Sequence, residues 1–391
     1  MKVLYCNPIF FEYRLPFYKE LVRLFKGDFY IMYSPIRYKI CNKSHLCETI
    51  KKEMGDNAIP FYGDHVFDTN SKKWDVMPDI EKGKRIPFTW GLLKKINTVK
   101  PDVIITEGYF QWTPIVQLWA LLHHVPIYLG YERTIWTERN NSKVITFIRK
   151  LQNKFIKGFI VNGGETKKYL ESIEVESSKI FIGGMSADSR KLKMDVKLFR
   201  SKNCDKFNYG LRPITDSNGL LFLFVGVIAE RKGIDRLLEV WSEHTKRYPK
   251  DLIWIVGDGN LYEPLKNKFN KDKTIIFFGK VDYNSVYKYY AVSDVFILPT
   301  IEDNWSLVVP EAMSCGLPVA TSIYNGCHPE LIHEGVNGCT FDTFNQESIL
   351  KALDYFHHVD LKEHGRKSIE IEKEFNTENC ARRVYDAITK Q

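Results

Sequence analysis

Three carboxylates stand close together in the stretch IEDNWSLVVPEAMSCGLPVA, residues 301–320: Glu302, Asp303 and Glu311. No Lys or Arg separates them, and neither occurs anywhere between residues 289 and 350. A salt-bridged surface would alternate charges, and a metal site would usually bring more ligands. Carboxylates that accept hydrogen bonds from the hydroxyls of a ribose or a hexose need no cation partner. We therefore interpret the stretch as a hydroxyl-binding site, against the alternative that its acids only cap a helix dipole.

A second candidate site combines two cations with a glycine turn in FLFVGVIAERKGID, residues 222–235. The pattern predicts a strand, a turn at Gly226, a loop with Arg231 and Lys232, and a helix that begins at Gly233. Amides at a helix start and adjacent cations together form an anion site, so we expect a phosphate there. The alternative is a plain strand–helix turn whose lysine points to solvent.

Two further glycine turns follow apolar runs, in IVGDGN with Gly257 and in FFGKVD with Gly279. The first lacks the third glycine of a dinucleotide fingerprint. Backbone groups of Gly279, Lys280 and Val281 could lie along a flat base, although an ordinary structural turn explains the same residues.

The segments around these motifs alternate between strand-like and helix-like patterns, which is typical of a parallel sheet covered on both faces. In the first half, the helical stretch RLPFYKELVRLF should face inward with Leu15, Phe17, Leu21, Leu24 and Phe25. The strand-like runs of that half are KVLYCN, DFYIMYS, PDVIITEG, PIYLGYE, KGFIVNG and KIFIGG.

The alternation stops between about residues 195 and 218, where the chain is polar and contains Gly, Pro and Asn. We place a linker at 196–217, after an N-terminal Rossmann-like domain at 1–195. Five strands separated by four helices then predict a second doubly wound sheet at 218–374. Open α/β sheets bind ligands beyond the carboxyl ends of their strands, so we expect a cleft between two facing domains.

Length and charge agree with two domains that have different partners. A chain of 391 residues exceeds the size at which one hydrophobic core stops growing. Residues 1–200 carry 33 Lys and Arg against 21 Asp and Glu, whereas 201–391 carry 23 against 27, which sums to the net charge of +8. The basic half suits an anionic membrane face or a phosphate-bearing substrate, or is simply a solvated lysine-rich surface. No basic helix or RNA-binding aromatic pattern indicates nucleic acid.

The cysteines and the apolar runs indicate the compartment. Several of the eight cysteines lie inside apolar runs, as buried reduced thiols do, and the CNKSHLC stretch lacks a second ligand pair at zinc spacing. The start of the chain does not read as a signal peptide, and we expect no bilayer-crossing segment. We therefore expect a cytoplasmic protein, with peripheral contact to the inner membrane face as a further option.

Taken together, these motifs resemble the retaining, GT-B-fold glycosyltransferases of family 4, also called group 1 transferases. The resemblance is strong over 218–345 and weaker over 1–195. The family signature is a Glu, seven residues, a second Glu and then AMAxGxPV, which stands here as Asp303 to Glu311 with AMSCGLPVA. The family's GG-x-x-E-x-I tract stands here as YNGCHPELIHEGVNG.

The resemblance implies a nucleotide-sugar donor, UDP- or GDP-linked, bound mainly by the C-terminal domain without a metal or other cofactor. Glu311 would hold the ribose hydroxyls, Asp303 the sugar, and Lys232 the diphosphate. The implied donor-binding residues are Gly226, Arg231, Lys232, Gly257, Gly279, Lys280, Val281, Asn304, Trp305, Ser306, Leu307 and Glu311. GT-B enzymes of this type do not need the metal-binding Asp-x-Asp motif, and none occurs in the sequence. A C-terminal helix at about 375–391 would cross back to the first domain.

The chain also departs from the family pattern. Val227 stands where the family usually has an Arg that contributes to diphosphate binding, and Asp303 is one methylene shorter than the usual Glu. NPIFFEYRLPF replaces the glycine-rich loop that many relatives have after the first strand. The nearest equivalent of the family's His-Asp pair is in GYERTIWTER, where Glu132 is our catalytic candidate and Arg133 and Arg139 are acceptor-binding candidates. The alternative is an ordinary charged loop.

The resemblance implies transfer with retention of anomeric configuration. Such a transfer needs a stabilised leaving phosphate, and we take Lys232, Asp303, Glu311 and Glu132 as the catalytic set. No nucleophile stands out, so we expect same-face attack assisted by the leaving phosphate. The acceptor would be a saccharide or a polyprenyl-diphosphate-linked saccharide of surface polysaccharide or glycolipid synthesis. The alternatives are a nucleotide-sugar epimerase and a nucleotide-sugar-binding protein that has lost catalysis.

Overall fold

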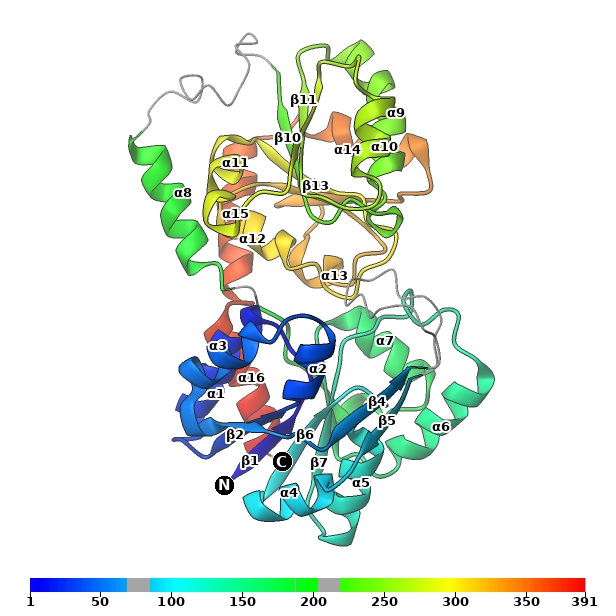
Figure 1. Ribbon diagram of the computed structural model, residues 1–391. Helices are drawn as coiled ribbons and strands as arrows, with labels where there is room; N and C mark the ends of the chain where they lie inside the picture. The colour runs from blue at the N-terminus through cyan, green and yellow to red at the C-terminus, as the bar shows by residue number, and fades with distance from the viewer. Residues whose placement is uncertain (69–84, 187, 203–218, 391) are drawn as a thin grey trace.

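The computed structural model describes residues 1–68, 85–186, 188–202 and 219–390. Two lobes lie one above the other, each built on a parallel sheet, and both chain termini lie in the lower lobe (Figure 1). This arrangement confirms the two doubly wound sheets that the sequence predicts.

The N-terminal domain has a seven-stranded parallel sheet in the order β3-β2-β1-β6-β7-β8-β9. Its strands are β1 (Val3–Cys6), β2 (Phe29–Tyr33), β3 (Ala58–Pro60), β6 (Val103–Glu107), β7 (Ile127–Tyr131), β8 (Gly158–Val161) and β9 (Ile180–Ile182). A separate antiparallel pair consists of β4 (Asp64–Asp68) and β5 (Arg85–Thr89). The helices are α1 (Leu15–Leu24), α2 (Pro35–Ile40), α3 (His45–Met54), α4 (Leu92–Val99), α5 (Thr113–Leu122), α6 (Lys143–Asn153) and α7 (Gly164–Ser172).

The C-terminal domain has a six-stranded parallel sheet in the order β12-β11-β10-β13-β14-β15. Its strands are β10 (Leu221–Val225), β11 (Leu252–Val256), β12 (Ile275–Gly279), β13 (Val295–Leu298), β14 (Val319–Ser322) and β15 (Gly338–Phe341). The sequence predicted the first five of these strands and missed β15. The helices are α9 (Ile234–Arg247), α10 (Tyr262–Lys268), α11 (Tyr287–Val292), α12 (Val308–Ser314), α13 (His328–Leu331), α14 (Gln346–Tyr355) and α15 (Leu361–Lys373).

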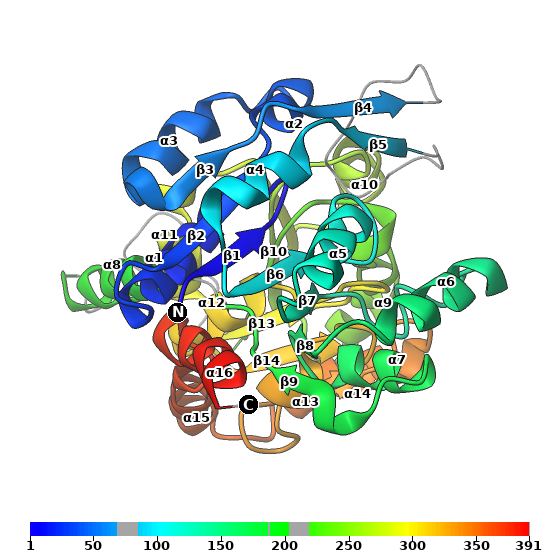
Figure 2. The same cartoon turned by 90° about the horizontal axis from the view of Figure 1, so that it is seen from below.

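Helices cover both faces of the N-terminal sheet (Figure 2). Strand β1 is apolar throughout because both of its faces are buried. Val3 and Tyr5 join one hydrophobic cluster, and Leu4 and Cys6 join another. Successive side chains of a strand point to opposite faces, so a sheet covered on both sides needs apolar residues at every position. The five residues expected to face inward from α1 and its end are all buried, which confirms that prediction.

Two helices connect the domains. Helix α8 (Arg190–Lys202) continues through the first residues of the segment expected as a linker, and 203–218 lie outside the described residues. Its Leu192 and Val196 are buried with the C-terminal core, and Arg200 donates hydrogen bonds to carbonyl oxygens of that domain. Helix α16 (Thr377–Thr389) returns the chain to the first domain and packs against α1. No helix in the described part of the chain is long and apolar enough to cross a bilayer.

Segments that follow strands of the two sheets contact each other, since the amide of Gly164, after β8, donates to Glu330 Oε1 of α13, after β14, at 2.5 Å. In the second sheet, β10 pairs with both β11 and β13, so consecutive connections leave in opposite directions from β10. Such a switch point opens a crevice at the carboxyl ends of the strands. The predicted phosphate loop follows β10 and the acidic stretch follows β13, so the topology brings the two candidate motifs together.

Candidate functional site

A cavity of about 710 Å³ opens at the carboxyl edge of the C-terminal sheet. The loops after β10, β11 and β12 and the start of α12 enclose it. It is lined by Val225, Gly226, Val227, Val256, Gly257, Asp258, Gly259, Asn260, Lys280, Val281, Tyr283, Val286, Val308 and Glu311. Five of the predicted donor-binding residues therefore line the same cavity: Gly226, Gly257, Lys280, Val281 and Glu311.

The glycine turns are required by close backbone contact. Gly257 has φ +139°, and a Cβ there would overlap the carbonyl oxygen of Gly226. The loops after β10 and β11 can thus approach each other only if residue 257 lacks a side chain. The predicted Gly279, at the end of β12, accepts a hydrogen bond from the amide of Gly257 through its carbonyl oxygen at 2.9 Å.

Glu311 lies in the first turn of α12 and borders the cavity. Tyr283 donates its hydroxyl to Oε1 at 3.2 Å, and Tyr290 donates to Oε2 at 3.4 Å. The carboxylate thus accepts hydrogen bonds from two tyrosine hydroxyls of the protein itself. That it holds ribose hydroxyls stays a prediction. Burial raises the pKa of Glu311 to about 7, because a buried carboxyl group resists ionisation and the two tyrosine hydroxyls offset this only in part. No sequence motif marks either tyrosine.

Asp303 corrects one expectation. The sequence suggested carboxylates without a counter-charge, but Lys232 Nζ contacts Asp303 Oδ2 directly, and Arg231 Nη1 lies 3.7 Å from the same oxygen. The cations come from the loop after β10, about seventy residues earlier in the chain, so local sequence could not reveal the pair. Burial would raise the pKa of Asp303, but the Lys232 ammonium outweighs it and holds the pKa below its usual range.

Lys232 is only 7% exposed, which excludes the alternative of a solvent-facing turn lysine. It ends a short 3-10 helix (Glu230–Lys232), and Gly233 follows with φ +62°. The carbonyl oxygen of Arg231 accepts hydrogen bonds from the Ile301 amide and the Thr300 hydroxyl, both at 2.9 Å. These bonds fix the loop after β10 against the loop after β13.

The loop that leads into α12 already uses part of its hydrogen-bonding capacity. The Trp305 amide donates to Asp303 Oδ1 at 3.2 Å, and the Ser306 amide donates to Asn325 Oδ1 at 3.4 Å. These two amides are therefore engaged within the protein. Those of Asn304 and Leu307 donate to no partner among the described residues.

Several buried polar atoms around this loop have no hydrogen-bond partner within the described residues: Asn304 Oδ1, Trp305 Nε1, Ser306 Oγ and Arg231 Nε. An unpaired buried polar atom costs about 1–3 kcal/mol, so such atoms are rare in folded proteins. Two of them, Arg231 Nε and Asn304 Oδ1, belong to residues next in sequence to the Lys232–Asp303 pair, where a polar ligand would supply missing partners.

The N-terminal candidates are held by partners that the sequence analysis missed. The carboxylate of Glu132, just after β7, contacts the guanidinium of Arg14. Arg14 Nη2 also lies 3.8 Å from Oε1 of Glu107, at the end of β6, and Glu107 accepts a hydrogen bond from the Tyr5 hydroxyl. Glu107 ends β6 and Glu132 directly follows β7, and this shared position at the carboxyl ends of neighbouring strands is the sequence signal that could have linked them.

Arg133 and Arg139 do not converge on Glu132. Arg133 has a 57% exposed side chain and lies 3.3 Å from Glu138 Oε1. Arg139 bridges the domains, with 3.0 Å between its Nη2 and Oε2 of Glu302. The third carboxylate of the acidic stretch therefore also has a counter-charge, and its partner comes from the other domain.

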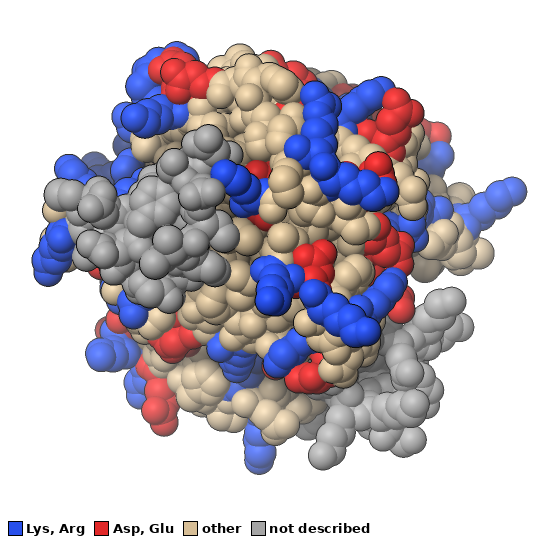
Figure 3. Space-filling view, turned by 90° about the horizontal axis from the view of Figure 1, so that it is seen from above, with Lys and Arg blue, Asp and Glu red and all other residues tan. Residues whose placement is uncertain are grey.

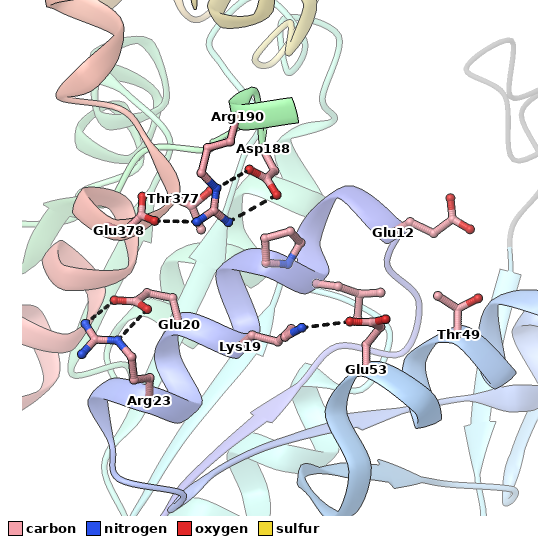
Figure 4. Close-up of a pocket in the computed structure, with 12 residues that line it drawn as sticks. Glu12, Lys19, Glu20, Arg23, Thr49, Glu53, Asp188, Arg190, Thr377 and Glu378 are labelled. Carbon is pink, nitrogen blue, oxygen red and sulfur yellow. Dashed lines mark hydrogen bonds and ion pairs between the residues drawn. The ribbon is translucent and has the colours of Figure 1, made fainter. Parts of the chain in front are cut away.

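A second cavity of about 570 Å³ lies between α1, α3 and the start of α16. Figure 4 shows that its charged side chains are largely paired with one another, as Lys19 is with Glu53 and Arg190 is with Asp188 and Glu378. We assign no function to it.

The fold agrees with comparisons to known proteins. Two parallel-sheet domains that meet at the carboxyl ends of their strands define the GT-B fold. The Anabaena protein HepE in complex with UDP has this fold, with a TM-score of 0.73 at 12% identity over 100% of both chains. The same protein has been solved with UDP-glucose, with a TM-score of 0.68 at 13% identity over 100% of both chains. Residues 212–373 of the chain match the model for glycosyl transferases group 1.

Curated relatives extend the match. A sulfoquinovosyl transferase of Arabidopsis thaliana is 24% identical over 366 residues, which cover 84% of this chain and 66% of that protein. An alpha-monoglucosyldiacylglycerol synthase of Acholeplasma laidlawii is 27% identical over 176 residues, or 43% of this chain and 44% of that protein. The chain spans between 38% and 66% of the length of the curated relatives that it matches first.

Proposed function

We propose that this chain is a glycosyltransferase that moves a sugar from a nucleotide-sugar donor to a saccharide or lipid-linked saccharide acceptor. The observation that carries the proposal is the cavity bordered by Glu311, next to the buried Lys232–Asp303 pair. Its volume of about 710 Å³ suits a ligand of nucleotide size.

The donor would bind along this cavity. The base would lie against the walls near Gly226, Gly257 and Val281, and the ribose hydroxyls would replace those of Tyr283 and Tyr290 as donors to Glu311. UDP and UDP-glucose in the Anabaena neighbour make a uridine nucleotide the first candidate to test.

The diphosphate would bind Lys232 and Arg231 near the start of α9, where the helix dipole also favours an anion. In that complex Asp303 would share its cation with the phosphate and could accept a hydrogen bond from a sugar hydroxyl. The leaving phosphate is then stabilised as the glycosidic bond breaks. We propose this without a metal ion, since the sequence contains no Asp-x-Asp motif; turnover that is insensitive to a chelator would support it.

We propose transfer with retention, by same-face attack of the acceptor hydroxyl. Glu132 would lie on the acceptor side, and Arg14 would hold its carboxylate in place. The anomeric configuration of the product by NMR tests this point, and a trapped glycosyl adduct on a side chain would contradict it.

The acceptor is proposed to be lipid-linked and used in surface polysaccharide or glycolipid synthesis at the cytoplasmic face of a membrane. The support comes from the basic N-terminal half and from relatives whose names include a glucosyldiacylglycerol synthase and a phosphatidylinositol mannoside mannosyltransferase.

One observation favours a second candidate, a nucleotide-sugar-binding protein without catalysis. Val227 lines the cavity where the family usually has an Arg, so that cation is missing, and Lys232 and Arg231 both face Asp303. Such a protein would bind the nucleotide but not turn it over.

The test is a thermal shift series with nucleoside diphosphates and nucleotide sugars on wild type and Glu311→Ala. We expect one nucleotide to raise the Tm of the wild type, because a ligand that binds only the folded state stabilises it, and the variant to lose this shift. The same donor is then incubated with candidate acceptors. No shift with any nucleotide would contradict the proposal, and a shift without turnover on any acceptor would favour the binding protein.

A further inference from the structure

Helix α6 (Lys143–Asn153) carries its apolar residues on the outside. Val144 and Phe147 are 67% and 62% exposed, and Phe155, just after the helix, is 54% exposed. With Ile148 and Leu151, which are also exposed, they follow the spacing i, i+3, i+4, i+7 and i+11, which is one stripe of a helix. We call these five residues the α6 face. Such a stripe normally packs against the core, so here the helix is reversed.

Polar residues hold α6 in this orientation. Arg149 and Asn153 point inward and are buried. Arg149 Nη1 donates to Glu138 Oε2 at 2.8 Å, and Asn153 accepts a hydrogen bond from the Tyr109 hydroxyl at 2.8 Å. Asn153 also donates to the Ile173 carbonyl oxygen at 3.1 Å. Because breaking a buried charge pair is costly, the helix cannot rotate to bury its apolar stripe.

The neighbouring helix extends the apolar surface. Gln117 of α5 donates its side-chain amide to the Gln152 carbonyl oxygen at 2.8 Å, so the two helices are in contact. Helix α5 carries three exposed leucines, Leu118, Leu121 and Leu122. Figures 1 and 2 both place α6 at the outer edge of the N-terminal domain, where it is open to a partner.

The segment that carries α6 is basic, and one of its lysines, Lys150, pairs with the exposed Glu174 of the following segment at 2.7 Å. Between residues 139 and 164 the sequence contains Lys and Arg at six positions and no Asp or Glu. Lys143, Lys154 and Lys157 are exposed, and none of the three forms an ion pair with another described residue. By contrast, both signs alternate over the end of the molecule that the C-terminal domain forms (Figure 3). An exposed apolar stripe flanked by lysines matches the boundary between acyl chains and anionic headgroups.

We infer that the α6 face, with its flanking lysines, docks the protein on an anionic lipid bilayer. The apolar side chains enter the headgroup region, and the ammonium groups bind lipid phosphates. This inference deepens the proposed function, because it rests on a lipid-linked acceptor and names the surface that would meet the membrane. Binding to vesicles requires neither donor nor turnover, so the two proposals can fail separately.

The test is flotation of the purified full chain with vesicles of phosphatidylcholine, with or without phosphatidylglycerol. We expect the wild type to float with the anionic vesicles and to remain below with the neutral ones. Phe147→Ser with Leu151→Ser should lower partition about a hundred-fold, since burial of each side chain contributes roughly ten-fold or more. Lys154→Glu with Lys157→Glu should lower it at least about twenty-fold.

Matched controls distinguish the effect of this surface from the effect of removing any exposed apolar side chain or reversing any two lysine charges. Met194→Ser removes an apolar side chain that is 71% exposed on α8, and Lys271→Glu with Lys273→Glu makes the same charge change on the C-terminal domain. Both controls should float like the wild type, and all variants should keep the nucleotide-induced thermal shift.

Other outcomes would overturn the inference. They are a wild type that does not bind anionic vesicles, or Phe147 and Leu151 variants that still bind. A concentration-dependent dimer that these variants abolish, without vesicle binding, would show that a second copy covers the α6 face instead.

Discussion

The two sides of the molecule that meet at the carboxyl ends of the sheets are built differently. On the C-terminal side, the cavity, the buried Lys232–Asp303 pair and the polar atoms without partners all come from loops that directly follow adjacent strands. On the N-terminal side, Glu132 depends on Arg14, over a hundred residues earlier, and Arg139 points across to the other domain. The C-terminal side thus gathers its polar groups from loops of neighbouring strands, whereas the N-terminal side, where we propose that the acceptor binds, depends on contacts between distant segments.

The largest expected effect is at Lys232. If the C-terminal side stabilises the leaving phosphate, Lys232→Ala should lower kcat/KM by about 10²–10³, which is the usual cost of removing one charge-stabilising donor. The variant should also lose up to about 3–5 kcal/mol in the free energy of unfolding, because Asp303 remains buried with only the more distant Arg231 as a counter-charge. Steady-state kinetics and denaturant unfolding measure the two effects.

A double variant, Lys232→Ala with Asp303→Asn, sharpens this result. It removes the unpaired charge, so stability should largely return while activity should not. Activity that recovers together with stability would mean that Lys232 acts only as a structural partner.

A smaller effect is expected from the pH dependence of Glu311. With a pKa of about 7, its carboxyl group is mostly neutral at pH 6 and mostly ionised at pH 8. Ribose hydroxyls need the ionised acceptor, so nucleotide affinity should rise about ten-fold across this range. Titration calorimetry at each pH measures it.

The same ionisation should destabilise the free protein. Because the pKa of Glu311 is raised from 4.5, its contribution to stability is present at low pH and is lost as the pH rises toward about 7. Glu311→Gln should remove the pH dependence of stability and the part of the pH dependence of nucleotide affinity that Glu311 causes. Only the pH dependence that comes from ionisation of the nucleotide phosphate should remain. An unchanged slope in this variant would exclude Glu311 as the titrating group.

The smallest effect should come from the bridge between the domains. Arg139 and Glu302 are both partly exposed, and such pairs contribute about 0–1 kcal/mol. Arg139→Ala should leave donor affinity unchanged and raise the KM for the acceptor a few-fold. A double-mutant cycle with Glu302→Ala measures the coupling, and a large loss of donor affinity would refute the division of roles between the two sides.

The sequence predicted site residues correctly placed in the cavity where each motif lies within a single strand-to-helix loop. Gly226, Gly257, Lys280, Val281 and Glu311 were all predicted from strand-to-helix connections, and all line one cavity, because parallel strands deliver their following loops to the same edge. That they bind a donor remains a prediction.

The sequence was uninformative where side chains from distant segments meet. An acidic stretch without Lys or Arg suggested carboxylates without counter-charge, yet Asp303 and Glu302 both have cationic partners from other loops. Periodicity likewise identifies an amphipathic helix but does not say which face is inward. The reversed orientation of α6 depends on Glu138 and Tyr109, which only the fold brings to Arg149 and Asn153.

The return of α16 to the first domain has a consequence for synthesis of the chain. Cys380, Ala381, Val384 and Ile388 complete the hydrophobic cluster that begins at Val3. At about 5–20 residues per second, the ribosome takes roughly ten seconds or more to make the C-terminal domain that intervenes. During that time one face of the N-terminal sheet stays open to water. The first domain to emerge is therefore the last to close, and until then its exposed apolar face is a site where chaperones would bind or nascent chains would aggregate.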